Sequence, residues 1–416
     1  MGRGPSPSNS VSTRAPRRTG RAASHGPLPG RRGGRPAVLN PSPLPVPPDY
    51  AGRSLANLLT AVGAHLGVPG CDDDVVGLAA AERYVVVMVD GLGWELLMAA
   101  LAELPGLADL MTDVRELATV VPSTTVTALT SLGTGLPPGG HGLVGYRFWA
   151  PHLKAYVTPL HWAVRATPAE IQPQPTLLER ASAAGVTVGR VVPPDQVASP
   201  FSAAALRGSS AVGVTEQDVV TWVEQVRLAA EADRRTLVYA YDRSLDHVGH
   251  AHGVDSAAWL TAARELDHRL GLLRSRLGPD TVVLITGDHG MVDVPPDRRV
   301  GIETTEELNA DLDHVAGEAR FRHLHTARPG AVAARWRDWA GERAWVLEKA
   351  EAIAAGWFGA VGPLAAPRLG DVVVAARADW AFLSRTTPVE AKLVGMHGSL
   401  TGAELRVPLF VTRGTR

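Results

Sequence analysis

Six short runs of mostly apolar residues constrain the fold of this chain more than any other feature of its sequence. They lie at residues 84–89, 186–192, 236–241, 281–286, 372–376 and 407–411. Runs that are apolar at nearly every position are typical of strands buried on both faces, as in mostly parallel sheets covered by helices. The runs therefore predict an α/β protein with a mostly parallel central sheet.

Segments with helical periodicity separate these runs. One predicted helix covers residues 255–277, with an apolar stripe formed by Leu266, Leu270, Leu273 and Leu277. Another is predicted to start at Thr215, because Asp218 follows three residues later, before the apolar residues 222–226. Two long insertions, 147–180 and 296–370, interrupt the pattern. Their aromatic residues suit a lid or substrate wall, although the second insertion fits a helical layer over the sheet equally well.

The charge of the chain is unevenly distributed. Eight arginines and no acidic residue precede Asp49, so the rest of the chain has a net charge of −9. An acidic body argues against a nucleic-acid partner. Residues 1–48, rich in Arg, Gly, Pro and Ser, are predicted to be a disordered tail. Contact with polyanions is one candidate role for this tail. The alternatives are that it is an idle solvated extension or that the translation start is mis-assigned. Residues 49–416 would form the catalytic domain.

Several features bear on the location of the protein. Arg17 and Arg18 are not followed by an apolar stretch, so no secretory signal is predicted. No apolar run reaches the length needed to span a bilayer. The single cysteine, Cys71, excludes an internal disulfide and leaves the compartment open. A cytoplasmic location is the default expectation, and the oligomeric state is not readable.

Acidic and imidazole side chains follow three of the predicted strands. Asp90 ends the first run, Asp246 follows 236–241, and the pair Asp288 and His289 follows 281–286. In parallel sheets, ligands collect beyond the carboxyl ends of the strands. A carboxylate there suits a divalent cation, although an Asp after a strand is also a common helix N-cap.

Further histidines lie near these groups. Asp246 and His250, four residues apart in a predicted turn, would share one ion through O and N ligands that suit zinc. His247 and His252 are assigned to positions beside the ligands or on the surface. His397 precedes the last apolar run, which returns it to the sheet.

A threonine pair precedes the next predicted helix. Thr124 and Thr125 lie before a segment that is predicted to be helical up to Thr134, with Gly135 after it. Free N–H groups at a helix N-terminus favour phosphate, but the same pattern also fits a threonine N-cap. A threonine hydroxyl becomes nucleophilic only when a base or a metal removes its proton. The hypothesis therefore requires metal ligands elsewhere.

Five segments of the sequence resemble the alkaline phosphatase superfamily, most closely its nucleotide pyrophosphatase/phosphodiesterase branch. They are VDGLG, PSTTVTALTSLGTGLPPGGHG, DHVGH, TGDHGM, and GMHGS followed by VPLFV, and they span about residues 83–412. The resemblance implies a three-layer α/β/α sandwich in which the two insertions form cap segments. It also implies hydrolysis of a small phosphoester, with nucleotides among the candidates, through a phosphothreonine intermediate.

The resemblance also implies roles for individual residues. Two zinc ions would be held, one by Asp246, His250 and His397, the other by Asp90, Asp288 and His289; manganese suits the same ligands. Thr125, rather than Thr124, aligns with the nucleophile. One position departs from the family. Where its diesterases usually have an Asn that contacts a phosphoryl oxygen, this chain has Tyr146 followed by Arg147.

Tyr146 and Arg147 are therefore predicted to bind substrate, although Tyr146 would alternatively pack at the domain edge. This departure leaves phosphomonoester and phosphonate hydrolysis open beside diester hydrolysis. Sulfatases are disfavoured because Cys71 lacks their sequence context, and mutases because they use a serine nucleophile. A zinc-binding protein without turnover is the alternative from a different class.

Overall fold

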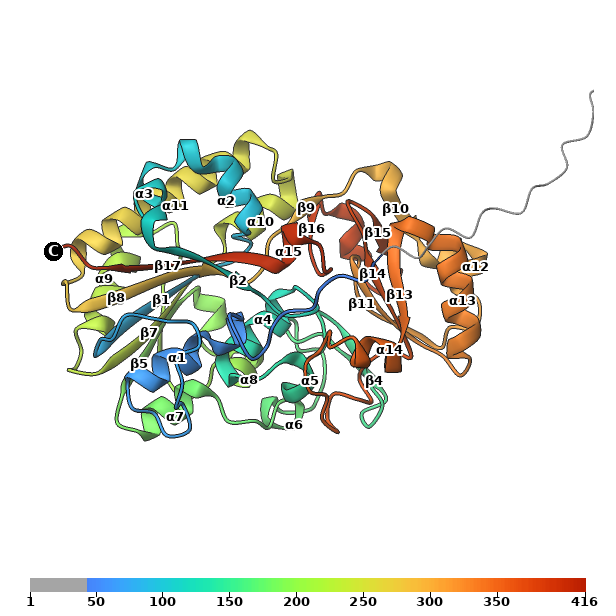
Figure 1. Cartoon of the computed structure of the whole chain (residues 1–416), viewed down its shortest axis with the longest axis horizontal. Helices are drawn as coiled ribbons and strands as arrows, with labels where there is room; N and C mark the ends of the chain where they lie inside the picture. The colour runs from blue at the N-terminus through green and yellow to red at the C-terminus, as the bar shows by residue number, and fades with distance from the viewer. Residues whose placement is uncertain (1–42) are drawn as a thin grey trace, which may run out of the picture. The chain divides into compact units, whose positions relative to one another are not determined.

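The computed structural model describes residues 43–416 (Figure 1). Most of the predicted tail, residues 1–42, lies outside this part, and residues 43–48 form no helix or strand. Within residues 43–416, seven strands form the central sheet. In spatial order they are β2 (Val114–Ala118), β17 (Arg406–Arg413), β8 (Thr281–Gly287), β1 (Arg83–Val89), β7 (Thr236–Asp242), β5 (Thr187–Val192) and β6 (Ser210–Gly213).

The sheet is mostly parallel, as the sequence predicts. The pairs from β8 through β1, β7 and β5 to β6 are parallel, and only β17 runs antiparallel to its neighbours β8 and β2. Strand β1 shows why its run is apolar throughout. Tyr84, Val86 and Met88 belong to one core cluster, and Val85, Val87 and Val89 belong to another. Each face of the sheet therefore has its own hydrophobic core.

Helices cover both faces and complete the three-layer α/β/α sandwich (Figure 1). One layer contains α2 (Trp94–Ala100), α3 (Pro105–Ala108), α9 (Val219–Ala230), α10 (Ser244–His252) and α11 (Ala257–Arg276). The other contains α1 (Leu58–His65), α4 (Thr125–Thr134), α6 (Pro168–Ile171), α7 (Leu177–Ala183) and α8 (Pro200–Ala205). Helix α5 (Pro138–His141) follows α4.

The predicted helices form, with one correction at a boundary. The predicted leucine stripe is buried as expected, although its last member, Leu277, is the C-cap of α11. Helix α9, however, begins at Val219, and its N-cap is Asp218, whose side chain accepts a hydrogen bond from the Thr221 N–H. The predicted start at Thr215 is therefore wrong, because the local carboxylate satisfies the free N–H group instead.

A second, antiparallel sheet lies in the C-terminal half. Its strands, in spatial order, are β11 (His314–Glu318), β12 (Phe321–His325), β14 (Val372–Ala376) and β13 (Ala344–Glu348). Its helices are α12 (Glu306–Asn309), α13 (Pro329–Ala340) and α14 (Lys349–Ala354). The run 372–376 is thus a strand, but its assignment to the central sheet is wrong. Val372 and Val374 pack on α13, whereas Val373 and Ala375 join a core cluster of the central sheet.

Short elements complete the described chain. The strand pairs are β3 (Phe148–Ala150) with β4 (Ala155–Val157), β9 (Val292–Asp293) with β16 (Gly395–Met396), and β10 (Arg299–Gly301) with β15 (Ala381–Leu383). Helix α15 (Gly402–Leu405) precedes β17. No helix in residues 43–416 is long and apolar enough to cross a membrane.

Helix α4 packs so closely on α8 that we expect Gly133→Ala to destabilise the protein. A Cβ at position 133 would overlap the carbonyl oxygen of Ala205. Overpacking of this kind costs about 1–3 kcal/mol or more of unfolding free energy, which urea denaturation would measure. The control is Gly271→Ala on α11, where a Cβ meets no atom within 4 Å and better helix propensity should add about 0.5–1 kcal/mol. Equal effects at the two positions would contradict this prediction.

Candidate active site

Three central strands end at the same level, which brings their following residues together. Val89 at the end of β1 is in register with Asp242 of β7 and with Gly287 of β8. Asp90 and Asp288 are the next residues on two of these strands, and the Asp90 N–H donates to the Asp242 carbonyl at 2.8 Å. The carboxyl edge of the sheet therefore carries the first part of the candidate site.

Asp90, Asp288 and His289 form one buried group. His289 Nε2 lies 3.3 Å from Asp90 Oδ1 and 3.5 Å from Asp288 Oδ2. The other oxygens of the two carboxylates are engaged. Asp90 Oδ2 accepts from the Tyr241 hydroxyl, and Asp288 Oδ1 accepts from the Gly91 N–H. Asp90 Oδ1 and Asp288 Oδ2 have no hydrogen-bond partner among the described residues.

Asp246, His250 and His397 form the neighbouring group. Asp246 and His250 lie on helix α10 rather than in the predicted turn, and their four-residue spacing places them on one face. Asp246 Oδ1 lies 3.2 Å from His250 Nε2 and 3.7 Å from His397 Nε2. His397 follows β16, whose pairing with β9 brings the loop back to the sheet edge.

The two groups are in contact. The rings of His289 and His397 stack with their centroids 3.6 Å apart. Among the described residues, the sets close enough for one ion are Asp90 with Asp288 and His289, and Asp246 with His289 and His397. His289 therefore lies within reach of both positions. His250 is in neither of these sets, although its Nε2 lies 3.2 Å from Asp246 Oδ1, so its role as a ligand stays a prediction.

The rings of His250, His289 and His397 are oriented in the same way, through a contact of Nδ1 with a backbone carbonyl. Nδ1 of His250 lies 2.8 Å from the Gly395 carbonyl, Nδ1 of His289 lies 3.0 Å from the Gly290 carbonyl, and Nδ1 of His397 lies 2.9 Å from the Ser123 carbonyl. A carbonyl only accepts, so Nδ1 carries the proton and Nε2 keeps its lone pair. Such backbone contacts commonly hold metal-binding imidazoles in place.

The electrostatics of the cluster also suit cations. Burial, followed by the charges of Asp288 and Asp246, raises the pKa of Asp90 well above its ordinary value. Burial likewise raises the pKa of Asp288. Burial and the nearby imidazoles hold the pKa of His397 well below its usual range. Divalent cations would relieve this repulsion between carboxylates and bind neutral imidazoles, so the residues present fit metal ions.

Thr125 borders this cluster at the start of helix α4. Its Oγ1 lies 3.2 Å from His289 Nε2. Thr124 occupies the N-cap position, but its side chain makes no capping hydrogen bond. Asp90 is not a cap either, because the N-cap of the following helix α2 is Gly93. Thr124 is therefore the N-cap of α4 by position but not through its side chain, and Asp90 caps no helix.

The structure separates Tyr146 from Arg147. Tyr146 borders the same cavity as Thr125, and its hydroxyl lies 3.1 Å from His161 Nε2. The Arg147 guanidinium lies 3.9 Å from the ring centroid of Tyr156 and donates to the Thr386 carbonyl. Arg147 is not among the cavity-lining residues. Of the predicted site residues, it alone is not brought to the cluster or its cavity.

The cavity beside the cluster has a volume of about 740 Å³. Its wall includes the apolar Leu160, Phe201 and Val389 and the cationic Arg243 and Lys392. His247 also borders the cavity, whereas His252 is exposed on the surface.

The sequence interpretation missed two residues at this site. Tyr241, which donates to Asp90, lies inside an apolar run and carries no signal of its own. Glu318 ends β11 and borders the cavity, but its segment has no recognisable motif. For Glu318, the one signal available in the sequence was an acidic residue at the end of an apolar segment.

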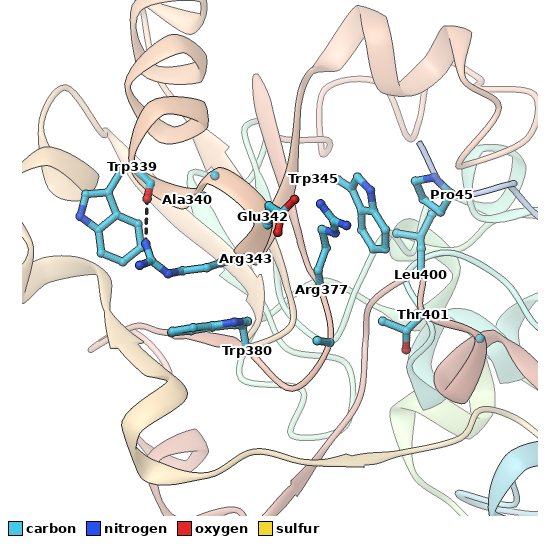
Figure 2. Close-up of a pocket in the computed structure, with 13 residues that line it drawn as sticks. Pro45, Trp339, Ala340, Glu342, Arg343, Trp345, Arg377, Trp380, Leu400 and Thr401 are labelled. Carbon is cyan, nitrogen blue, oxygen red and sulfur yellow. Dashed lines mark hydrogen bonds between the residues drawn. The ribbon is translucent and has the colours of Figure 1, made fainter. Parts of the chain in front are cut away.

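A second cavity, of about 870 Å³, lies elsewhere (Figure 2). The Arg343 guanidinium lies between the indoles of Trp339 and Trp380, 5.0 Å from each ring centroid. Arg377 similarly lies 5.2 Å from the ring of Trp345. The arginines and tryptophans that line this second cavity therefore stack on one another. No residue of the metal-ligand cluster lines it. The candidate chemistry therefore belongs to the first cavity.

The fold and the cluster at its sheet edge define an alkaline-phosphatase-like α/β protein. Residues 84–400 match the sequence model described as type I phosphodiesterase / nucleotide pyrophosphatase, and the chain belongs to this family. No curated protein sequence matches it significantly.

Solved structures share the fold. Murine ectonucleotide pyrophosphatase / phosphodiesterase 5 is 20% identical, with a TM-score of 0.62 over 80% of this chain and 89% of that chain. The human protein of the same name is 17% identical, with a TM-score of 0.64 over 80% and 88%. Phosphonoacetate hydrolase from Sinorhizobium meliloti 1021 is 18% identical, with a TM-score of 0.62 over 81% and 92%.

Proposed function

We propose that this protein hydrolyses phosphoesters, with Thr125 as nucleophile and two divalent cations, preferably zinc, as cofactors. One observation carries the proposal. Oxygens of Asp90, Asp246 and Asp288 are buried without hydrogen-bond partners among the described residues. Each of them faces an imidazole Nε2 within 3.2–3.5 Å, next to the Thr125 hydroxyl. Such an arrangement is costly unless cations bind there.

The two groups of ligands would each hold one cation. One group is Asp246, His250 and His397, and the other is Asp90, Asp288 and His289. Bound cations would favour the alkoxide form of Thr125 and offset the charge that develops on the phosphoryl and leaving oxygens. Carboxylate and imidazole ligands suit zinc and also accept manganese.

The residues of the chain then define the order of the reaction. Thr125 Oγ1 bonds to phosphorus as the bond from phosphorus to the alcohol oxygen breaks, and the hydroxyl proton leaves with the alcohol. Water then bonds to phosphorus as the bond to Thr125 Oγ1 breaks, and a water proton restores the hydroxyl. Because Thr125 is the first residue of α4, free N–H groups of that helix would lie near the phosphoryl oxygens of a bound substrate.

Relatives of known structure suggest the substrates to compare. The murine protein, as an inactive variant 19% identical to this chain, has been solved in complex with AMP. The Sinorhizobium hydrolase has been solved with phosphonoacetate. We propose a small phosphodiester or nucleotide as the substrate here. A phosphonate is the second candidate, because Tyr146 replaces the Asn expected of diesterases.

Metal removal should abolish this activity. Treatment with a chelator is expected to stop hydrolysis of bis-p-nitrophenyl phosphate, and added zinc or manganese to restore it, because the unpaired carboxylates would otherwise repel substrate. Rates with a diester, a monoester and a phosphonate, together with elemental analysis, provide the measurement. Two metal ions per chain are expected. Full activity in metal-free protein would contradict the proposal. Bound zinc with no turnover of any substrate would support the non-enzymatic alternative.

A further inference from the structure

Glu318 occupies a position beside the nucleophile that nothing in its sequence predicts. It ends β11 and is 7% exposed. A Cβ on Gly398, the residue after His397, would lie 3.1 Å from Glu318 Oε1 and 2.7 Å from its Cγ. The Thr124 side chain, next to the nucleophile, also interacts with this carboxyl group. Glu318 is therefore enclosed by the two segments that carry Thr125 and His397.

Only one oxygen of this carboxyl group accepts a backbone hydrogen bond, although the Thr124 side chain is near enough to the group to lower its pKa. Oε2 accepts a hydrogen bond from the Tyr146 N–H at 3.0 Å. Oε1 is buried and has no hydrogen-bond partner among residues 43–416. Since Glu318 also borders the cavity that contains Thr125, a molecule bound in this cavity is the candidate partner for Oε1. A buried oxygen without a partner is costly, so a ligand that supplies one stabilises the site.

The charge of the ligand decides the form in which Glu318 acts. A group held at Thr125 carries negatively charged phosphoryl oxygens, and an ionised carboxylate facing them would repel them in a buried site. A neutral carboxylic acid instead donates a hydrogen bond to such an oxygen. The Tyr146 hydroxyl, which the sequence suggested for this contact, is already engaged with the ring of His161.

We propose that Glu318, as a neutral carboxylic acid, donates a hydrogen bond from Oε1 to a non-bridging phosphoryl oxygen of the substrate. The inference rests on the proposed function and adds a residue that contacts the reacting group. Glu318 would thereby make the contact with a phosphoryl oxygen that the sequence comparison expects of an Asn amide in diesterases. Tyr146 then acts through its backbone N–H, which orients the carboxyl group.

The surroundings of Glu318 support the neutral form. Burial raises the pKa of Glu318 to about 8, although contacts with the Tyr146 N–H and the Thr124 hydroxyl lower it. The charge of Glu390 raises the pKa further and that of Arg322 lowers it, but these two residues are paired with each other. Bound cations would lower the pKa of Glu318, and the phosphoryl charge would raise it. Because the neutral form is lost as the pH rises through this pKa, the rate of hydrolysis is expected to fall at alkaline pH.

The test compares Glu318→Gln with Glu318→Ala over a range of pH. The amide of Glu318→Gln still donates, so its rate at neutral pH should stay within about threefold of the native rate, and its alkaline fall should disappear. Glu318→Ala removes the donor and should lose about 10²-fold in kcat. Glu103→Gln, at an exposed ion pair with Arg264, is the matched control and should retain the native profile.

Several results would overturn the inference. They are a native rate in Glu318→Ala, equal losses in both variants, or an alkaline fall that persists in Glu318→Gln. Thermal unfolding and metal content show whether each variant is folded. If Glu318→Ala does not fold, the pH profile of Glu318→Gln decides alone. A native protein without hydrolase activity would instead contradict the proposed function, so the two failures are distinguishable.

Discussion

Thr125→Ala is expected to reduce turnover by on the order of 10³–10⁶-fold while leaving the metal content nearly unchanged. The reason is the position of its hydroxyl, which lies 3.2 Å from His289 Nε2 but belongs to neither group of predicted ligands. Removing it deletes the atom that would bond to phosphorus and leaves the carboxylates and imidazoles in place. Loss of metal together with activity would contradict the role of nucleophile.

Thr124→Ala is the matched control, because it removes the neighbouring hydroxyl. Its effect should be much smaller, since Thr124 lies beside Glu318 rather than His289. The measurements are kcat on a diester and metal analysis of both variants. Acid quenching of the native enzyme during turnover should yield a phosphorylated peptide containing Thr125. Phosphate on Thr124 instead would reverse the assignment.

Glu404→Ala should lower the free energy of unfolding by about 3–5 kcal/mol. Glu404 and Arg320 form an ion pair at 2.7 Å in which both side chains are fully buried. Removing the carboxylate leaves the guanidinium charged and buried. Glu404 also accepts hydrogen bonds from the Ser399 N–H and the Thr401 hydroxyl. The loop that follows His397 should therefore loosen, and metal affinity should fall with stability.

Urea denaturation and zinc titration would measure both effects. Glu116→Ala is the control, because Glu116 pairs with Arg406 at an exposed position and should cost less than about 1 kcal/mol. A double variant, Arg320→Met with Glu404→Leu, removes both charges and should recover part of the stability. A loss in Glu404→Ala no larger than in Glu116→Ala would show that the buried pair contributes little.

Much of the fold follows from local sequence patterns. The runs in β1, β7 and β8 are apolar at nearly every position because each strand is covered on both faces. Run 372–376 shows the limit of this argument. It is buried on both faces as well, between α13 and a core cluster, so its pattern is the same as that of a central strand although it belongs to the second sheet.

The candidate site shows the same division. Asp90 and Asp288 could be placed because each follows a recognisable strand, and strand ends in a parallel sheet meet at one edge. The helical setting of Asp246 and His250 was not foreseen, since a short polar segment gives little periodicity. Arg147 was expected beside the substrate because of its neighbour Tyr146, but adjacent side chains need not point to the same cavity.

The sequence alone determined which residues end the strands, that acids, imidazoles and a helix-starting threonine recur there, and that they follow the order of a known family. These properties depend on near neighbours in the chain. Only the tertiary structure decided that Asp246 faces His397, that β14 belongs to the second sheet, and that Glu318 borders the same cavity as Thr125. Such contacts join residues far apart in sequence, and they depend on how the sheets and helices pack together.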